Sequence, residues 1–426
     1  MLLAVLILSL FVLLAVGVPV AFALLLSAVP ILLWMGIPLQ VVITQTYSSV
    51  DSFTLLAIPF FMFLGRLLNA AQLTDRIVRF AHVLVGHIRG GLGHINVSVS
   101  MMFAAMSGSS HADTASVGSV MIPAMVKAGY PPAYSAAITA ASSIVGGIIP
   151  PSILMIIYGS FAQISIGALF LAGVIPGILI GLSQMVLNYV VAVREGYPAE
   201  RRATMCEVGR AALATSPALV IPVLILGGIS SGIFSPTEAA SITVLYTTLL
   251  IVLWVRSMSF RDYCRELGQA VVEYSLPLFA IACAGIFGWL IAFLQGPQII
   301  QGFVTSITTN YYAVALLLIA FLLLIGTFMS GIAAIIIFLP VIQQVGAVAG
   351  IDPIVLAMTT IIAISTGLLT PPYGISIFIA AQIAGIGSGA VFRAVLPLVL
   401  ALIAIVILGV VFPQIYLFLP DLLLNR

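Results

Sequence analysis

The stretch GSSHADTASVGSVMIPAMVKAGYPPAYSAAITAASSIVGGIIPPS, from Gly108 to Ser152, places polar and helix-breaking residues inside an otherwise apolar chain. It begins with a Gly-Ser-Ser turn at Gly108 and ends with a Gly-Gly-Ile-Ile-Pro-Pro break from Gly146 to Pro151. In a bilayer, irregular backbone is tolerated only where it is buried in protein or lines a cavity, because its free amides and carbonyls need partners. The stretch therefore predicts a binding site within the membrane.

A second copy of the pattern lies further along the chain. A shift of 221 residues aligns Gly146 with Gly367 and Pro150-Pro151 with Pro371-Pro372, without a gap. Paired Gly/Pro interruptions of hydrophobic segments in two repeats are the sequence signature of a secondary transporter's binding site. We therefore expect two related halves that share a transport site.

The composition predicts a polytopic membrane protein. Of 426 residues, 62% are hydrophobic and 6% are charged, whereas soluble domains carry about 25% charged residues. The net charge of +2 is too small to indicate a nucleic-acid partner. The N-terminal run has no basic n-region and is expected to be a retained span. The three cysteines are too scattered to indicate a metal cluster, and the sequence has no Gly-rich phosphate loop that would indicate an ATP motor. We therefore expect no cofactor.

Apolar runs and arginines together predict the topology. Runs near the spanning length of about 20 residues lie at 2–27, 30–48, 54–71, 168–193, 211–229, 238–255, 272–294 and 390–419. Arginines cluster at 76–89, 194–210 and 256–265, with a lone Arg393, and such loops are usually cytoplasmic. The span 54–71 must then end on the cytoplasmic side, whereas the corresponding span 272–294 ends on the periplasmic side. The two halves are therefore expected to be inverted, with both termini on the periplasmic side.

Each half also contains two shorter apolar arms that meet at a turn of small residues. The arms cover 95–106 and 117–128 around Gly108, and 312–325 and 332–348 around the segment 326–331. We expect two re-entrant hairpins, preceded by interfacial helices at 73–88 and 297–310. Pro132 lies 14 residues before Gly146, about 21 Å along a helix, so the break is expected within a hydrocarbon core of roughly 30 Å.

Helix starts can be predicted in two places. Ser235-Pro236-Thr237-Glu238 is typical of a capping box. Asp51-Ser52 before the span from 54 is expected to be a helix cap.

The breaks and turns supply the chemistry of an ion site. Broken helices expose carbonyls that suit a hard cation, and amides at helix N-termini favour an anionic group. Hydroxyls complete an oxygen shell in each half: Ser107, Ser109, Ser110, Ser142 and Ser143, and then Thr327, Ser330, Ser365, Thr366 and Thr370. The alternative for any one hydroxyl is that it lets helices pack closely.

Two ionisable residues in apolar surroundings leave alternatives open. Asp113 either binds a cation or carries a proton, or it caps the helix after the turn. Arg66 either reaches the interface, contacts a partner residue, or attracts an anion.

Several motifs carry a resemblance to a known family. They are SGSSHADTASVGS from Ser107, GYPPAYSAAITAASSIVGGIIPPS from Gly129, AGVIPG from Ala172, GIFSPTEAA from Gly232, and GIDP followed by TGLLTPPYG from Gly350. Together they resemble the large membrane subunit (DctM-like) of tripartite ATP-independent periplasmic (TRAP) transporters over essentially the whole chain. Ser330 and Ala363 depart from the family pattern, in which an acidic residue and an asparagine are common.

The resemblance implies a fold, a mechanism and partners. The fold is an all-α polytopic membrane protein with inverted repeats, re-entrant hairpins and discontinuous helices, of the elevator type. The function is sodium-driven import of an organic acid anion across the bacterial inner membrane. Partners are a small four-helix membrane subunit and a periplasmic substrate-binding protein, and sodium is the coupling ion. The expected parts are scaffold spans at 1–53, a first repeat at 54–167, connecting spans at 168–271, an inverted repeat at 272–389 and a C-terminal span at 390–426.

The resemblance also implies site residues. Sodium would be bound at Ser107, Gly108, Ser109, Ser110, Gly146 and Ile149 in the first half, and at Gly326, Ser330, Thr366, Gly367 and Thr370 in the second. Substrate would lie near Ser109, Asp113, Pro150, Ser152, Thr370 and Pro371.

Two other functions stay open. A one-component sodium/divalent-anion symporter shares the repeats and hairpins but works without a binding protein. An intramembrane enzyme needs a base, nucleophile or metal in the bilayer, and no second aspartate or histidine cluster accompanies Asp113. We therefore expect a transporter and no enzymatic activity.

Overall fold

The structure is a computed structural model that describes residues 1–71, 73–197, 199, 201–255 and 258–424. Within these ranges the chain is helical and contains no strand. Arg256, one of the arginines expected to mark a cytoplasmic loop, lies outside the described residues.

Two sets of helices follow a similar order along the chain. The first set is η1 (Phe53–Leu56), α4 (Ala57–Ala70), α5 (Leu73–Val85), α6 (Gly91–Ser107), α7 (Ser110–Lys127), α8 (Pro132–Ser143), η2 (Ile144–Gly147) and α9 (Ile153–Ala162). The second set is α13 (Phe260–Phe293), α14 (Gly296–Ile307), α15 (Tyr311–Gly326), α16 (Gly331–Val348), α17 (Pro353–Thr366), η4 (Gly367–Leu369) and α18 (Ile375–Ala384). Each set therefore contains a helical hairpin followed by an interrupted helix.

Other helices connect and close these sets. They are α10 (Ile166–Glu195), α11 (Met205–Ser230), α12 (Pro236–Leu249), which continues as the π-helix η3 (Leu250–Val255), α19 (Ser388–Val411) and α20 (Gln414–Leu424). The predicted capping box at α12 is confirmed, because Ser235 Oγ accepts from the Glu238 amide at 3.3 Å and the Glu238 carboxylate accepts from the Ser235 amide at 2.8 Å.

The N-terminal region differs from its prediction. Two spans were expected at 2–27 and 30–48, but the structure has three short helices, α1 (Leu2–Ala15), α2 (Val20–Trp34) and α3 (Gln40–Val50). Gly17 and Gly36 adopt positive φ angles of 89° and 70°, and Pro19 precedes α2. A left-handed glycine ends a helix and a proline cannot continue one. At 14 residues, α1 is about 21 Å long, short of the hydrocarbon thickness.

Two further boundaries differ. The expected cap at Asp51-Ser52 is wrong, because the Ser52 side chain makes no capping bond and instead contacts the hydroxyls of Thr54 and Ser160 at 2.8 and 3.2 Å. The expected C-terminal run at 390–419 is interrupted between α19 and α20, where Pro413 follows a non-helical Phe412 with φ -121° and ψ 79°.

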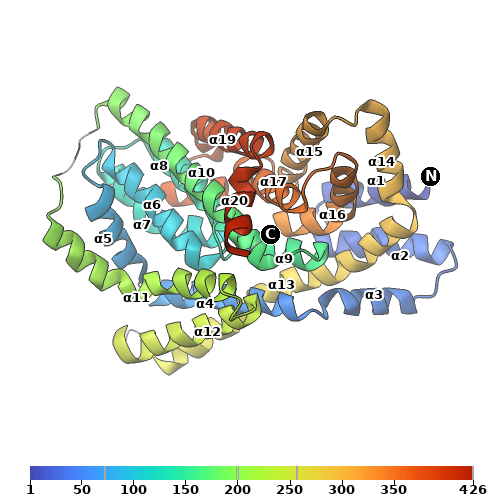
Figure 1. Cartoon of the computed structure of the whole chain (residues 1–426), viewed down its shortest axis with the longest axis horizontal. Coiled ribbons are helices and arrows are strands. Elements are labelled where there is room, and N and C mark those ends of the chain that lie inside the picture. The colour runs from blue at the N-terminus through green and yellow to red at the C-terminus, as the bar shows by residue number, and fades with distance from the viewer. Residues whose placement is uncertain (72, 198, 200, 256–257, 425–426) are drawn as a thin grey trace.

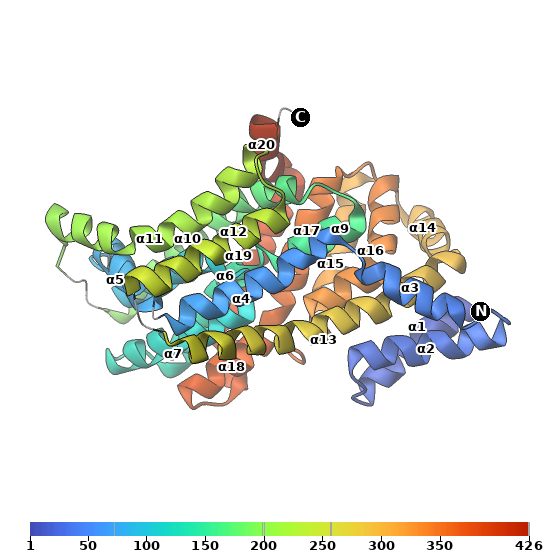
Figure 2. The same cartoon turned by 90° about the horizontal axis from the view of Figure 1, so that it is seen from below.

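One part of each interrupted helix, α9 and α17, lies in the middle of the molecule. Figures 1 and 2 place α9 and α17 between the first hairpin, α6 and α7, and the second hairpin, α15 and α16. The long helix α13 crosses the molecule and packs against α2, α3 and α4. Buried hydrophobic side chains of the described residues form one core cluster that includes both hairpins.

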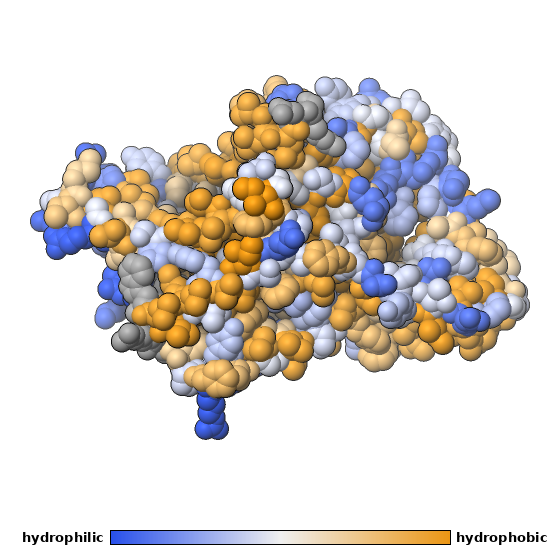
Figure 3. All heavy atoms as spheres, turned by 60° about the horizontal axis from the view of Figure 1, so that its bottom comes forward, coloured by the Kyte–Doolittle hydropathy of each residue, from blue (hydrophilic) through white to orange (hydrophobic). Residues whose placement is uncertain are grey.

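The outer surface is suited to lipid. Among the described residues, seven helices are long and apolar enough to cross a membrane. Hydrophobic side chains cover large parts of the face seen in Figure 3. A soluble protein does not expose contiguous apolar surface on this scale, so the surface fits a polytopic membrane protein.

Candidate functional site

The first hairpin turns at Gly108, between the end of α6 and the start of α7. Gly108 has a positive φ of 65°, and a Cβ atom there would lie 2.7 Å from the Pro151 carbonyl oxygen. Ser109 is the N-cap of α7 and accepts from the Ala112 amide at 3.5 Å. The turn therefore needs glycine and lies directly against the first Gly-Pro break.

Asp113 lies in the first turn of α7, beside the hairpin turn. Its side chain is fully buried, one carboxylate oxygen accepts from Ser107 Oγ, and the other oxygen has no hydrogen-bond partner among the described residues. The partnerless oxygen faces the break, because a Cβ atom on Gly146 would clash with it. The expectation that Asp113 caps the helix is wrong, since Ser109 occupies the cap and the Asp113 carboxylate accepts from a hydroxyl instead.

The first break is held by two serines. Ser110 Oγ donates to the Ile144 carbonyl at 3.3 Å. Ser152 is the N-cap of α9, where it accepts from the Met155 amide at 3.4 Å and donates to the Gly147 carbonyl at 2.6 Å. Ile149, Pro150 and Ser152 are buried. The break is therefore an interior feature, as the sequence predicts.

The second half repeats this arrangement. The Tyr373 amide donates to the Thr327 carbonyl at 2.8 Å, which ties the second turn to the second break. A Cβ atom on Gly367 would clash with the backbone of Gly326. Ser330 is the N-cap of α16 and accepts from the Ala333 amide at 3.3 Å.

Several expected hydroxyl ligands bond to their own helices. Thr366 Oγ1 donates to the Ile362 carbonyl at 2.8 Å, and Thr370 Oγ1 donates to the Gly367 carbonyl at 2.9 Å. Ser143 and Thr327 donate to the Thr139 and Leu324 carbonyls in the same way. A donating hydroxyl keeps lone pairs for a cation, so these contacts are compatible with cation binding.

The two halves meet at the first break. A Cβ atom on Gly147 would lie 3.3 Å from both Ser110 Oγ and Ser365 Oγ, and η2 packs against α17. Ser365 Oγ is buried and has no hydrogen-bond partner among the described residues. The first turn, the first break and the end of α17 therefore come together, whereas Pro371 lies exposed at the second break.

Arg66 has partners that the sequence did not reveal. Its guanidinium contacts Glu266 Oε2 at 2.7 Å, Glu273 Oε1 at 2.5 Å and Gln269 Oε1, all on α13. Of the three roles left open for Arg66, the structure supports the partner contact. The three α13 residues have helical spacing, but only the fold shows that this face meets α4.

A cavity of about 370 Å³ lies elsewhere, between α1, α13, α14, α15 and α16. Its lining is hydrocarbon, with residues such as Leu10, Phe287, Phe303 and Phe338. It offers no donor to an anion, so this cavity is not a candidate for the anion site.

Comparisons with known proteins agree with this geometry. The sequence profile of a family described as the tripartite ATP-independent periplasmic transporter, DctM component, matches residues 7–415. The chain belongs to this family. It is 37% identical to the sialic acid TRAP transporter large permease protein of Vibrio cholerae, over 97% of each chain. It is also 37% identical to the C4-dicarboxylate TRAP transporter large permease protein of Pseudomonas aeruginosa, over 93% of this chain and 92% of that one.

A solved structure supports the fold class of this DctM-family chain. MtrF, an efflux pump of Neisseria gonorrhoeae, matches with a TM-score of 0.59 and 16% identity, over 87% of this chain and 84% of that one. At this identity the match concerns the fold alone. The family assignment confirms that the chain is a transporter permease subunit in a membrane and not an enzyme.

Proposed function

We propose that this large permease imports an organic acid anion across the bacterial inner membrane, driven by a sodium gradient. A periplasmic substrate-binding protein delivers the anion, and a small four-helix membrane subunit supports the scaffold. The word tripartite in the family description supports two further components. The hairpins and interrupted helices form the part that moves, in an elevator manner, between inverted scaffold spans with both termini in the periplasm.

The observation that carries the proposal is the incomplete shell of Asp113. A buried carboxylate costs free energy unless a proton, a cation or hydrogen bonds compensate its charge. Among the described residues, only one of its oxygens accepts a hydrogen bond, and the other faces Gly146. A sodium ion bound next to Asp113 supplies that compensation. Its other ligands are oxygen atoms of Ser107, Ser109, Ser110, Gly146 and Ile149, and Gly108 allows the turn.

The second sodium site has the same backbone form but no carboxylate. We place it at the close approach of Gly326 and Gly367, with Ser330, Thr366 and Thr370 as oxygen donors. The repeat of turn and break supports this site. Because every donor there is neutral, we expect it to bind sodium more weakly than the first.

The substrate anion is expected between the two turns. Ser109 and Ser152 cap the N-termini of α7 and α9, and helix N-termini favour negative charge. Asp113, Pro150, Thr370 and Pro371 would border the anion. The two relatives above are named for sialic acid and C4-dicarboxylates, both organic acids, which supports this substrate class.

The test is uptake into proteoliposomes that hold all three components. We expect uptake of the anion bound by the partner binding protein to require an inward sodium gradient. Asp113→Asn should raise the sodium concentration for half-maximal uptake roughly tenfold or more, because a contact with a charged group contributes about 1.5 to 3 kcal/mol. Asp75→Asn is the matched control, since Asp75 is exposed on α5.

Three results would contradict the proposal in different ways. Uptake that does not depend on sodium contradicts the proposal that a sodium gradient drives transport. Uptake by this chain alone indicates the one-component symporter. An unchanged sodium profile in Asp113→Asn, beside normal uptake, removes the first site.

A further inference from the structure

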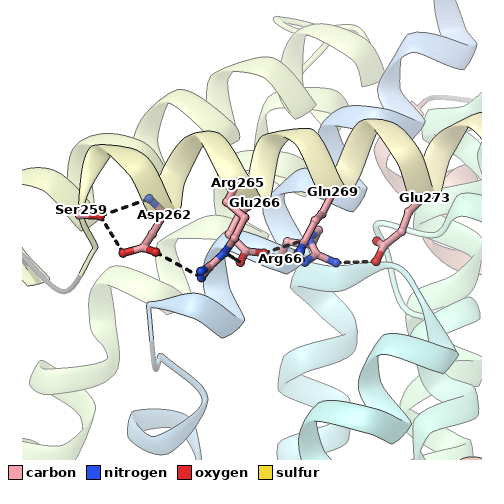
Figure 4. Close-up of polar contacts among 7 residues, drawn as sticks. All are labelled: Arg66, Ser259, Asp262, Arg265, Glu266, Gln269 and Glu273. Carbon is pink, nitrogen blue, oxygen red and sulfur yellow. Dashed lines mark hydrogen bonds and ion pairs between the residues drawn. The ribbon is translucent and has the colours of Figure 1, made fainter.

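Arg66 connects the two sets of helices at one point. It lies on α4, which leads into the first hairpin, and its partners lie on α13, which leads into the second hairpin. In Figure 4 its guanidinium lies between Glu266, Gln269 and Glu273, which extend from the same side of α13. Three residues spaced by three and four positions share one helix face, so a single arginine bridges about two turns of α13.

The contact is built to be specific. Arg66 Nε donates to Glu266 Oε2 at 3.0 Å, and Nη2 forms an ion pair with the same oxygen at 2.7 Å. Nη2 also donates to Gln269 Oε1, and Nη1 contacts Glu273. The side chain of Glu266 is 12% exposed and that of Glu273 is 50% exposed, so solvent weakens the Glu273 contact more. A planar guanidinium with five donors suits this arrangement, whereas the single ammonium of lysine does not.

The residue before Arg66 contacts the candidate ion site. A Cβ atom on Gly65 would lie 3.5 Å from both the Cα and the Cβ of Ser107, and Ser107 Oγ donates to Asp113. Successive helical residues point about 100° apart. The same turn of α4 therefore presents Arg66 to α13 and Gly65 to the end of α6, and α4 packs on both helices.

We propose that Arg66 is a positioning residue for the first ion site. By fixing the register of α4 on α13, Arg66 holds Gly65 against Ser107 and keeps the Ser107 hydroxyl directed at Asp113. The link to sodium rests on the proposed function, whereas the link from Arg66 to the Gly65–Ser107 contact does not.

The first test measures that contact directly. Cysteines at two positions with Cβ atoms 3.5 to 4.5 Å apart form a disulfide readily, so the Gly65→Cys/Ser107→Cys pair should crosslink on mild oxidation. The experiment uses the full chain in its membrane, with Cys206, Cys264 and Cys283 replaced by serine. We expect Arg66→Gln to reduce the crosslinked fraction at a fixed oxidation time. Arg261→Gln, which removes an exposed arginine from the first turn of α13, should not.

The second test measures transport. Arg66→Gln should raise the sodium concentration for half-maximal uptake by roughly two- to thirtyfold, the range of indirect coupling between residues, with a smaller change in maximal rate. Arg66→Lys should restore only part of the shift. If Arg66→Gln does not fold, Glu273→Gln provides the milder version, because Glu273 is half exposed.

The outcomes separate the two claims. Equal crosslinking with and without Arg66 overturns the positioning role, whatever transport shows. Reduced crosslinking with an unchanged sodium profile overturns the link from Arg66 to the ion site. Reduced crosslinking in a transporter whose uptake never depended on sodium supports the positioning of Ser107 and overturns the proposed coupling.

Discussion

At the scale of single residues, the site depends on glycines where two backbones meet. A side chain on Gly367 would clash with the backbone of Gly326, whereas a side chain on Gly146 would clash with the end of the Asp113 side chain. A side chain can rotate away and a backbone cannot, so Gly146 should tolerate a larger residue better than Gly367. The sequence alignment of Gly146 with Gly367 identified both positions but could not reveal this difference.

We expect Gly367→Ala to destabilise the protein more than Gly146→Ala. Forcing a methyl group into a packed interior typically costs about 1 to 3 kcal/mol, and the upper end is expected at Gly367. Thermal unfolding in detergent, followed by intrinsic fluorescence, measures the difference. Gly288→Ala is the control, because that glycine is helical with open space beside it. A Gly367→Ala variant as stable as Gly288→Ala would contradict the close approach of the two backbones.

At the scale of elements, the sequence predicted what local signals encode. Gly and Pro mark the two breaks and the two turns, and each lies where it was expected. The N-terminal division into three helices was missed because the high apolar content of 2–27 outweighed the Gly17–Pro19 signal. The partners of Arg66 lie 200 to 207 residues away in the chain, and no local pattern pairs such distant positions.

Ser152 shows how an element boundary is stabilised inside the membrane. The family resemblance implies that Ser152 contacts substrate, and the structure adds bonds to the backbone on both sides of the break. We expect Ser152→Ala to lower the free energy of unfolding by about 1 to 3 kcal/mol, because the buried Gly147 carbonyl loses its donor. Ser152→Thr should retain most of the stability, since threonine also caps helices.

The matched control is the exposed cap of α12. Ser235→Ala removes a capping hydroxyl near solvent, where water replaces the lost partner, and should cost about 1 kcal/mol. The thermal unfolding midpoints of Ser152→Ala, Ser152→Thr and Ser235→Ala rank the stabilities of the three variants. If Ser152→Ala is no less stable than Ser235→Ala, the bond across the break contributes little.

At the scale of the whole molecule, fold class and family followed from composition and motifs, because these are spread along the chain. The inverted topology is a separate prediction, which rests on the arginine-rich loops and on the family resemblance. Cys206 lies in the first turn of α11, directly after such a loop, and is exposed, as is Cys264 near the start of α13, whereas Cys283 is buried. The exposed thiols therefore report which side of the membrane each loop occupies.

We expect a membrane-impermeant maleimide to label Cys206 and Cys264 in inverted vesicles and neither in intact cells. In a background where all three cysteines are replaced, Ser231→Cys, between α11 and α12, should be labelled only from outside. Inversion is tested by one exposed position from each half: Asp75→Cys on α5 should react from inside and Thr309→Cys after α14 from outside. The reason is that α4 and α13 are expected to cross the membrane in opposite directions. The helix after α4, α5, then lies on the inside, and the helix after α13, α14, lies on the outside. If both positions react from the same side, the halves are parallel, and the two Gly-Pro breaks cannot open the site alternately to opposite faces by one shared movement.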